Sequence, residues 1–441
     1  MKVLVVGSGG REHALCTMCT KSLEVSEVFV APGNPGMKKS LPKLNIVNIE
    51  QTQVEELLNF ALNEKIFLTI VGPEVSLAAG IVDEFRKNKL LIIGPTLKAS
   101  QLESSKTFAK EIMKKANVPT ANYQEFFSSY EAISYIESLP DQVTQKMVIK
   151  CDGLAQGKGV IVCLSKSEGV KAVNDLMINK ILGFDVSHII IEDFLEGSEL
   201  SAFALCDGED FTFFGTACDH KRLRNNDQGP NTGGMGVYSP ANSLDEMDIQ
   251  FINEKIFLPT LKTMKDEGVP FTGILFAGLM KTKLGIKVIE FNVRLGDPES
   301  QALLPLIEDD MVDWFLAAAK CQLKEFKKVS RKTSPKFKNM KAVHVVMAAY
   351  GYPGTEGISI RSGDDLIFSP EFNLSPNDYL FYAGVMKNIG HEFLQTKGGR
   401  ILGVTSLAET YTFARSQAYN NISKIQFEGA QYRSDIGQGL V

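Results

Sequence analysis

Hydrophobic positions in the first hundred residues form short β-branched runs separated by longer stretches with helical spacing. The runs lie at 3–6, 28–30, 68–71 and 90–93. The helical stretches lie near 12–20, 53–62 and 78–87. Such alternation of strand and helix is typical of a parallel sheet covered on both faces. The pattern therefore predicts a Rossmann-like α/β domain over residues 1–103.

Beyond this region the pattern mixes strands and helices. Residues 104–116 begin with serines that can cap a helix and stop before Val118-Pro119, so they are expected to connect to a second domain. The pattern then predicts a small α+β unit, with a strand ending at Lys150, a glycine-rich turn, a strand at 159–164, a helix at 167–180 and a strand at 188–193. The polar, glycine-rich run at 219–236 has no periodicity and is predicted to be a functional or disordered loop.

The last part of the chain begins with basic residues clustered between 324 and 341, which are most simply a solvated linker. New β-rich patterning follows the cluster. It predicts strands near 343–349, 379–385 and 400–405 and a helix near 406–422. A small β-rich carboxy-terminal domain is therefore expected.

Composition narrows the classes of protein to consider. The 441 residues have a formal net charge of -5, which argues against a nucleic-acid partner. No apolar run approaches the ~18 residues that cross a bilayer, so no membrane partner is expected. The seven cysteines are scattered, and the amino terminus has the pattern of a strand rather than of a signal peptide. These features predict reduced thiols and a cytoplasmic location.

Cysteines and histidines offer no convincing metal site. Cys16 and Cys19 lie three apart in the first predicted helix, and without a second pair they are expected to pack that helix. The five histidines include no pair at helical ligand spacing, and His188 and His344 begin apolar strand-like runs. A structural role is expected for both.

The first strand ends in the glycine-rich turn Gly7-Ser8-Gly9-Gly10, where backbone amides at a helix start can accept a phosphate. A dinucleotide site would also need an acidic residue after the second strand to bind a ribose. That strand ends instead in Ala31-Pro32-Gly33-Asn34. The turn therefore favours a phosphorylated substrate over a nicotinamide dinucleotide.

The run from Gly153 to Gly159 resembles a phosphate loop. Its spacing is one residue short of the P-loop motif, and glycine stands where that motif needs Ser or Thr. Preceded by Lys150 and flanked by strands, it better fits a flexible hairpin that closes over nucleotide phosphates. A purely structural hairpin is the alternative.

Two further stretches carry carboxylates at strand ends. Glu192 and Glu199 lie at the end of one strand, where a carboxylate can bind ribose hydroxyls. In Lys287–Ser300, alternation places Val288, Glu290, Asn292 and Arg294 on one face of a strand. Glu290 and Asn292 offer hard oxygen ligands to magnesium, beside a cation that can meet an anionic oxygen.

These motifs, in this order, resemble the ATP-grasp superfamily and, within it, the phosphoribosylamine–glycine ligase family. The resemblance covers the whole chain. It rests on GSGGREHAL (7–15), APGNPG (31–36), VGPE (71–74), KCDGLAQGKGV (150–160), DHKR (219–222), GPNTGGMG (229–236), EFNVRLGDPE (290–299) and GYPG (351–354).

The resemblance implies an α/β fold of four parts and an ATP-dependent carboxylate–amine ligase acting on glycine and 5-phosphoribosylamine, as a monomer. The parts are a Rossmann-like domain at 1–103, an ATP-grasp catalytic domain at 104–122 and 193–327, its lid at 123–192 and a β-rich domain at 328–441.

The resemblance also implies roles for individual residues. ATP would contact Lys106, Lys150, Gly153, Gly157, Lys158, Gly159, Glu192, Phe194, Leu195 and Glu199. Mg²⁺ (or Mn²⁺) would bind Glu290 and Asn292. Catalysis would involve Asp219, Lys221, Arg222 and Arg294. The substrates would lie near Gly9, Gly10, Arg11, Glu12, Asn34, Pro35, Gly36, Asp297, Pro298 and Glu299.

Three alternatives stay open at this point. The chain could be another ATP-grasp ligase of purine synthesis, a nucleotide-sensing binding protein, or an oxidoreductase. The number of metal ions is also open, because the strand before the Glu290 strand, GILFAGLM (273–280), carries no acid.

Overall fold

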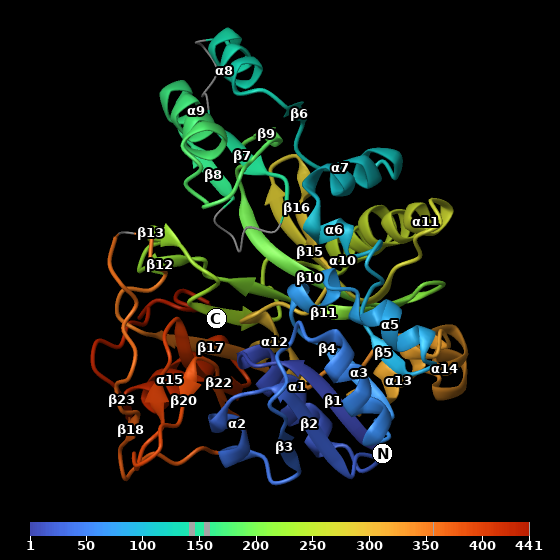
Figure 1. Cartoon of the computed structure of the whole chain (residues 1–441), viewed down its shortest axis with the longest axis vertical. Coiled ribbons are helices and arrows are strands. Elements are labelled where there is room, and N and C mark those ends of the chain that lie inside the picture. The colour runs from blue at the N-terminus through green and yellow to red at the C-terminus, as the bar shows by residue number, and fades with distance from the viewer. Residues whose placement is uncertain (141–145, 154–158, 356, 441) are drawn as a thin grey trace.

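The computed structural model describes residues 1–140, 146–153, 159–355 and 357–440. Three larger sheets organise the chain (Figure 1). A five-stranded sheet and part of an eight-stranded sheet lie at one end of the molecule. A four-stranded sheet with its helices projects from the other end.

The amino-terminal sheet is parallel throughout, with strand order β3-β2-β1-β4-β5. Its strands are β1 (Lys2–Gly7), β2 (Glu27–Pro32), β3 (Leu44–Ile46), β4 (Leu68–Val71) and β5 (Leu91–Ile93). Its helices are α1 (Gly10–Lys21), α2 (Pro35–Ser40), α3 (Val54–Asn63), α4 (Glu74–Ala78) and α5 (Ile81–Lys87). The predicted parallel sheet is confirmed. Strand β3 and helix α2 were not predicted, because segments this short show no clear periodicity.

The four-stranded sheet has the order β6-β9-β7-β8 and a hydrophobic core of its own around Ile136, Ile149 and Ile189. Helices α6 (Gln101–Ser104) and α7 (Lys106–Lys115) lead into it. Its elements are β6 (Tyr123–Phe126), α8 (Ser129–Ser138), β7 (Met147–Cys151), β8 (Val160–Cys163), α9 (Lys166–Val173), the π-helix η1 (Asn174–Ile178) and β9 (Ile189–Asp193). The hairpin predicted over 153–159 falls mostly on residues 154–158, which lie outside the described residues.

The eight-stranded sheet runs in the order β16-β15-β10-β11-β14-β17-β22-β19, and all its pairings are antiparallel. Five strands come from the middle of the chain: β10 (Ser198–Asp207), β11 (Phe211–Asp219), β14 (Gly236–Ser239), β15 (Thr272–Thr282) and β16 (Gly285–Asn292). Three come from its end: β17 (Lys341–Ala348), β19 (Asp378–Tyr382) and β22 (Arg400–Ala408). The carboxy-terminal strands therefore extend the central sheet through the β14–β17 pairing.

Shorter elements surround this sheet. Between β11 and β17 lie β12 (Arg222–Arg224), β13 (Gln228–Asn231), α10 (Glu246–Ile252), η2 (Asn253–Phe257), α11 (Leu258–Asp266), α12 (Glu299–Leu303), η3 (Leu304–Leu306), α13 (Met311–Ala319) and α14 (Leu323–Ser330). After β17 come β18 (Ile367–Phe368), β20 (Val385–Met386), β21 (Gln395–Thr396), α15 (Tyr411–Ile422) and β23 (Ile425–Gln426).

Two predictions from the pattern were wrong in detail. Residues 323–330 form helix α14, whose buried Leu323 joins the core, so the basic stretch is not simply a linker. The helix predicted near 406 begins at Tyr411, because the preceding residues complete β22. Within the loop predicted at 219–236, residues 222–231 form a hairpin of β12 and β13.

The face predicted for Val288 was also wrong. Glu290 pairs with Gly278 and Val288 pairs with Leu279, which leaves Ile289 as the extra residue of a β-bulge. The bulge reverses the alternation, so Val288 packs into the same core as Phe291 and Val293. Glu290 and Asn292 keep their shared face.

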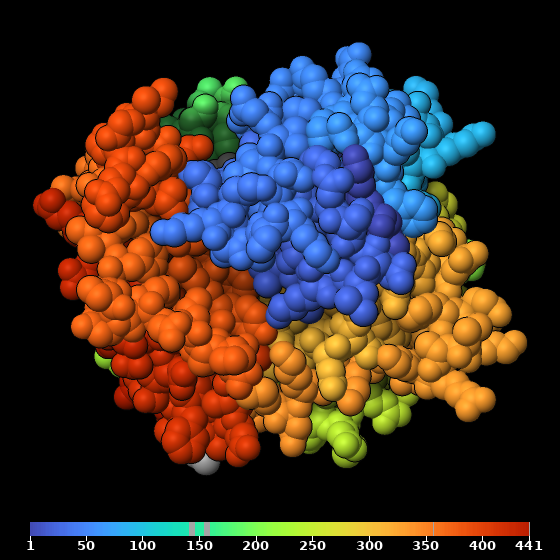
Figure 2. Space-filling view, turned by 90° about the horizontal axis from the view of Figure 1, so that it is seen from below, coloured from blue at the N-terminus to red at the C-terminus, as the bar shows by residue number. Residues whose placement is uncertain are grey.

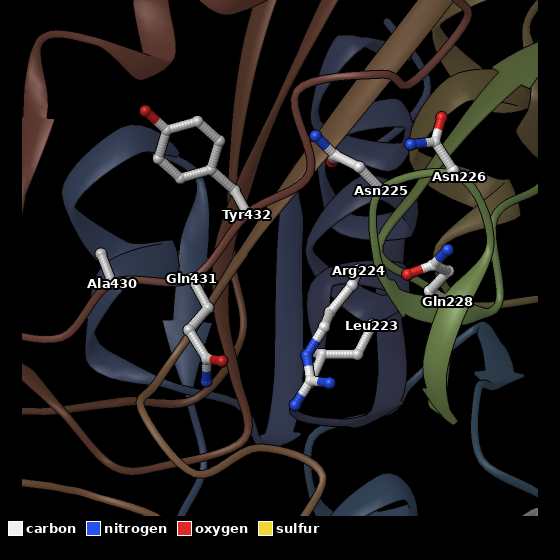
Figure 3. Close-up of a pocket in the computed structure, with 8 residues that line it drawn as sticks. All are labelled: Leu223, Arg224, Asn225, Asn226, Gln228, Ala430, Gln431 and Tyr432. Atoms are coloured by element: carbon white, nitrogen blue, oxygen red, sulfur yellow. The ribbon is translucent and has the colours of Figure 1, made fainter.

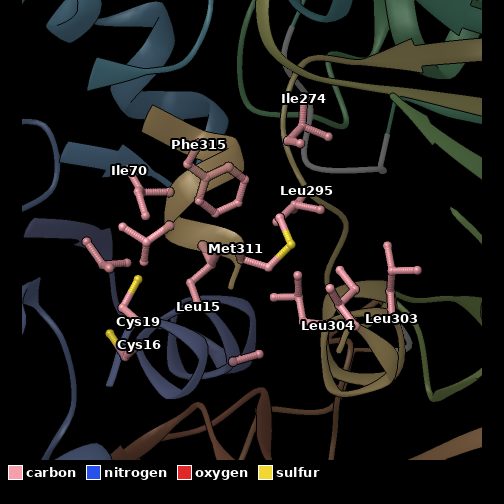
Figure 4. Packing of buried hydrophobic residues seen from close by; sticks show 14 of the residues in the cluster. Leu15, Cys16, Cys19, Ile70, Ile274, Leu295, Leu303, Leu304, Met311 and Phe315 are labelled. Carbon is pink, nitrogen blue, oxygen red and sulfur yellow. The ribbon is translucent and has the colours of Figure 1, made fainter. Parts of the chain in front are cut away.

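The amino-terminal and central sheets share one hydrophobic core (Figure 4). Leu15, Cys16 and Cys19 of α1 pack there with Met311 and Phe315 of α13. The expected packing role of the two cysteines is confirmed, and all seven cysteines are free thiols. Figure 2 shows the amino-terminal part (blue) and the carboxy-terminal part (orange to red) in contact on one face of the molecule.

Two buried histidines make hydrogen bonds in this region, and one of them, His13, joins the amino-terminal part to the carboxy-terminal part. His13 Nδ1 accepts a hydrogen bond of 2.9 Å from the Tyr382 amide, and His344 Nδ1 lies 2.9 Å from Thr405 Oγ1. Burial lowers the pKa of each imidazole to about 3. Both are therefore neutral in the folded protein, and the structural role expected for His344 is confirmed.

We predict that the free energy of unfolding falls as the pH is lowered from about 6.5 towards 3. Each histidine takes up a proton in the unfolded chain but not in the folded one, which costs up to about 1.4 kcal/mol per pH unit. His344→Gln should flatten this dependence, measured as melting temperature against pH. His391→Gln is the control, since His391 is exposed, and it should leave the slope unchanged. Equal slopes for wild type and His344→Gln would contradict the prediction.

Candidate active site

A buried cluster of charges lies where the four-stranded sheet meets the central sheet. Lys150 on β7 and Lys110 on α7 place their ammonium groups 3.0 and 3.2 Å from Glu192 Oε1, at the end of β9. The three side chains are 2–4% exposed. Burial lowers the pKa of Lys110 to about 8, although Glu192 opposes the shift. With two cations to one carboxylate, the cluster can attract an anion.

Lys150 makes a second contact that fixes it on the central sheet. Its ammonium donates a 3.0 Å hydrogen bond to the carbonyl of Ile289, the extra residue of the bulge in β16. A bulged residue has no ladder partner for its backbone groups, so its carbonyl is free to accept. The bulge thus sets both the direction of Glu290 and the position of Lys150.

Glu290 lies among cations. Burial opposes its ionisation, but Lys106, Lys221, Lys150 and Arg294 together lower its pKa below the usual value. It has no hydrogen-bond or ion-pair partner within the described part of the chain. Its carboxylate is therefore charged and available to a ligand.

Glu290 and Asn292 fit a magnesium ion by their chemistry. Both present hard oxygens from one strand face, and Asn292 Oδ1 has one long contact of 3.3 Å, to Arg294 Nη2. No group of three potential metal-binding acids, histidines or cysteines occurs among the described residues. The surrounding positive charge disfavours a lone dication. A metal would therefore bind together with an anion such as a nucleotide phosphate.

Arg294 ties β16 to the amino-terminal region. Its guanidinium lies 3.2 Å from a carboxylate oxygen of Glu74 and 2.9 Å from one of Glu103. Glu103 also accepts a 2.8 Å hydrogen bond from the Val293 amide. Burial works against the charge of Arg294, but Glu103 and Glu74 raise its pKa. Glu103 was not predicted from the sequence, because nothing near it in the chain marks it as a partner.

The remaining residues predicted for ATP binding surround the charge cluster. The ammonium of Lys106 donates to the Glu103 carbonyl at 3.1 Å. Lys146 lies over the ring of Phe194, and Leu195 beside it is half-buried. Gly159 accepts a hydrogen bond from the Cys151 amide at 2.8 Å, and a Cβ added at Gly153 would meet none of the described residues within 4 Å. Gly157 and Lys158 lie outside the described residues.

A group of acids and bases lies at the end of β11. Lys221 forms an ion pair with Glu199, which raises the pKa of Lys221 even though burial lowers it. Burial and the neighbouring Glu299 raise the pKa of Asp219, whose Oδ1 has no hydrogen-bond partner. Arg222 bonds within its own hairpin, to the carbonyl of Gly229 at 2.9 Å.

Beyond this group, a pocket of about 600 Å³ opens between the amino-terminal turn and the carboxy-terminal strands. Four predicted substrate residues line it: Gly9, Asn34, Pro35 and Asp297. Three basic residues that also line it were not predicted: Lys387, Lys397 and Arg400. These residues lie in the carboxy-terminal part of the chain, where the sequence pattern predicted strands but no binding site. A pocket with this lining can bind a small anionic ligand.

Arg400 holds the loops beside this pocket. It donates 2.7 Å hydrogen bonds to the carbonyls of Gly233 and Asp297 and lies 3.2 Å from the Asp297 carboxylate. Pro298 is the residue before α12 and would contact any side chain added at Gly234. Glu299 is buried and lies 3.4 Å from Ser201 Oγ.

The side chain of Glu12 occupies the space inside the glycine-rich turn. The Glu12 carboxylate, which is buried, accepts the Gly9 amide at 2.7 Å and Arg11 Nε at 2.6 Å. Gly10 packs against Gln301, so a side chain there would clash. Because these groups do not line the pocket, only the Gly9 end of the turn faces a ligand.

Asn34 organises the second loop of the pocket. Its Oδ1 caps α2 by accepting the Gly36 and Met37 amides, and its Nδ2 donates to the carbonyl of Ser8 at 2.8 Å. Gly36 packs against the Tyr382 ring, where a Cβ would lie 2.3 Å from it. The Asn34 loop is therefore held between Ser8 of the glycine-rich turn and Tyr382 of β19.

A four-stranded sheet beside a buried charge cluster, an antiparallel sheet that carries Glu290 and Asn292 on one face, and a basic pocket beyond are features of an ATP-dependent ligase of the ATP-grasp class. Family models of the phosphoribosylglycinamide synthetase N domain, ATP-grasp (A) domain and C domain match residues 1–103, 104–300 and 342–439. The chain belongs to the phosphoribosylglycinamide synthetase family, also named phosphoribosylamine–glycine ligase.

Individual relatives agree over their full lengths. The chain is 44% identical to a phosphoribosylamine–glycine ligase of Ralstonia nicotianae and 40% identical to one of Caldanaerobacter subterraneus, and 100% of each chain is covered. The crystal structure of the Thermotoga maritima phosphoribosylamine–glycine ligase superposes with a TM-score of 0.81 at 32% identity, covering 99% of this chain and 100% of that one. In the described part of this chain, no helix is long and apolar enough to cross a membrane.

We predict that Lys150→Met weakens ATP binding by about tenfold or more while the protein stays folded. Lys110 remains to pair with the buried Glu192, so the substitution leaves no unpaired carboxylate there. Titration of ATP by calorimetry measures the effect. The control is Lys115→Met on α7, whose ammonium is exposed and pairs with Glu267. An unchanged ATP affinity in Lys150→Met would contradict the assignment.

Proposed function

We propose that this protein joins glycine to 5-phosphoribosylamine with the energy of ATP, a step of purine biosynthesis. In the first displacement, a glycine carboxylate oxygen attacks the γ-phosphorus of ATP, and the bond to ADP breaks. In the second, the amine of phosphoribosylamine attacks the acyl carbon of glycyl phosphate. Phosphate leaves, and the amine loses a proton as glycinamide ribonucleotide forms.

One observation carries this proposal beyond the family resemblance. Glu290 follows Ile289, whose carbonyl binds Lys150 of the nucleotide end, and it shares its strand face with Asn292, which contacts Arg294 from the other direction. Lys106 and Lys221 also help to lower the pKa of Glu290. The nucleotide phosphates and an anionic acceptor can therefore approach one point from two directions. This is the arrangement that two successive displacements at one phosphoryl group require.

The chain's own groups act by position and charge. Lys106, Lys150 and Arg294 would neutralise charge on the transferring phosphoryl group, and the lid would exclude water from glycyl phosphate. Glu290 and Asn292 would hold magnesium or manganese, which supplies charge neutralisation at the phosphates when bound. No nucleophilic side chain is needed, because each bond-forming atom belongs to a substrate.

The basic pocket would bind phosphoribosylamine. Lys387, Lys397 and Arg400 supply positive charge for its phosphate, and the Gly9 turn and the Asn34 loop supply polar groups near the ribose. We further propose that residues 1–103 and 328–441 act together in this binding, with 123–192 as the nucleotide lid and with 104–122 and 193–327 as the catalytic domain.

We predict that ADP release requires magnesium, glycine and freshly made phosphoribosylamine together. A coupled assay across amino acids, with and without the amine, measures this requirement. Comparable turnover with alanine or serine would overturn the glycine assignment. ADP formation without any amine would indicate a different acceptor.

We also predict that Glu290→Gln lowers turnover about 10³-fold, because an amide keeps the shape but removes the charge that holds a dication. ATP affinity should fall less, since the Lys150 and Glu192 cluster is intact. Initial rates at saturating magnesium give the result.

Glu299→Gln is the matched control for this variant. Glu299 lies beyond the turn at Asp297-Pro298 and contacts Ser201 Oγ at 3.4 Å, so a milder loss is expected. Glu290→Gln activity above about a tenth of wild type, a difference below ~1.4 kcal/mol, would exclude Glu290 as a metal ligand.

A further inference from the structure

The hairpin formed by β12 and β13 follows Asp219 and Lys221 directly, yet it belongs to no larger sheet. An isolated two-stranded hairpin is marginally stable in water. Its tip is also unusual, because Asn226 and Asp227 both have positive φ angles, of 57° and 52°. Such a hairpin needs contacts from elsewhere to keep one conformation.

Those contacts come from the carboxy-terminal segment, residues 430–436. Arg433 is 2% exposed, and its guanidinium reaches the hairpin at two points. Nη1 donates to the Arg222 carbonyl at 3.1 Å and lies 2.7 Å from the Asp227 carboxylate. Asp435 completes the arrangement, since it pairs with Arg433 Nε at 2.7 Å and accepts the Asn226 amide at 2.8 Å.

The segment that carries Arg433 is itself well anchored. Gln431 exchanges two 2.8 Å backbone hydrogen bonds with Ala348 of β17, and Tyr419 of α15 donates to the Arg433 carbonyl at 2.7 Å. Figure 3 shows the hairpin residues and residues 430–432 on two sides of a pocket of about 560 Å³. The buried Arg433 side chain joins these two segments through its contacts with Arg222 and Asp227.

We infer that Arg433 is a positioning residue for the ligase site: by holding the Arg222 carbonyl and the hairpin tip, it fixes Lys221 and Asp219 relative to the substrates. This inference rests on the proposed function. The neighbouring backbone supports it, because the Lys221 carbonyl accepts both the amide and the hydroxyl of Thr232 across the base of the hairpin. Movement of the hairpin would therefore move Lys221.

The variant Arg433→Met tests the inference. ATP affinity is measured beside turnover, because a general loss of structure would lower both, whereas a positioning role lowers mainly turnover. Within the described part of the chain, no hydrogen bond or ion pair joins Lys106, Lys150 or Glu192 to the hairpin, and only Glu199 is linked to it, through Lys221. ATP affinity should therefore fall at most about threefold, while kcat/KM for phosphoribosylamine falls about tenfold or more. Hydrogen exchange of residues 222–231 should become faster. Arg361→Met removes exposed ion pairs in the same region and should change neither quantity.

Asp227→Asn provides a second variant in case Arg433→Met does not fold. Asp227 is 71% exposed, so this change should leave folding intact and cost roughly threefold in kcat/KM. The double variant should be no worse than Arg433→Met alone, because Arg433→Met already removes the Arg433–Asp227 ion pair that Asp227→Asn weakens.

Three results would overturn the inference: kcat/KM of Arg433→Met above half of wild type, ATP affinity falling in parallel with turnover, or independent effects in the double variant. Failure of the proposed function is distinguishable, since wild-type protein would then release no ADP with glycine and phosphoribosylamine. In that case, unchanged hydrogen exchange of the hairpin in Arg433→Met would still overturn the positioning role.

Discussion

The site is organised around the need to pair one buried ammonium, that of Lys150. A charge removed from water must find opposite charge or hydrogen-bond acceptors in the protein. Lys150 finds Glu192 within the four-stranded sheet and the Ile289 carbonyl on the central sheet. Because the four-stranded sheet has its own hydrophobic core, this polar contact helps to fix its position on the central sheet. The β-bulge that supplies the carbonyl also determines where Glu290 points.

Parts of this arrangement could be read from the sequence because they are local. Strand and helix alternation predicted the parallel amino-terminal sheet, and the spacing of Glu290 and Asn292 placed both on one strand face. The bulge at Ile289 could not be foreseen, since an extra residue in a strand depends on its partner, and the change of face at Val288 followed from it. Likewise, the basic pocket could not be predicted, because only folding brings Lys387, Lys397 and Arg400 into one pocket with Gly9.

The glycine-rich turn after β1 differs from the phosphate-binding turn of dinucleotide-binding folds, although the surrounding sheet and helix are alike. In dinucleotide-binding folds, free amides at the start of the first helix receive a phosphate. Here the Glu12 carboxylate takes the Gly9 amide and fills the space against Gly72, where a Cβ would lie 1.9 Å from Glu12 Oε1. An internal anion thus occupies part of the place that a pyrophosphate would need. The sequence shows a second difference from dinucleotide-binding folds, because no acidic residue follows the second strand to bind a ribose.

The continuous central sheet has a consequence for how this chain can be divided. Strand β14 pairs with β17 along residues 236–239 and 342–345, so main-chain hydrogen bonds cross from the middle of the chain to its end. A fragment ending before β17 would expose β14 as an unprotected edge, with free amides and carbonyls able to recruit strands from other molecules. The carboxy-terminal region is therefore no detachable module. A cut at this point in the chain would leave an aggregation-prone surface instead of a smaller enzyme.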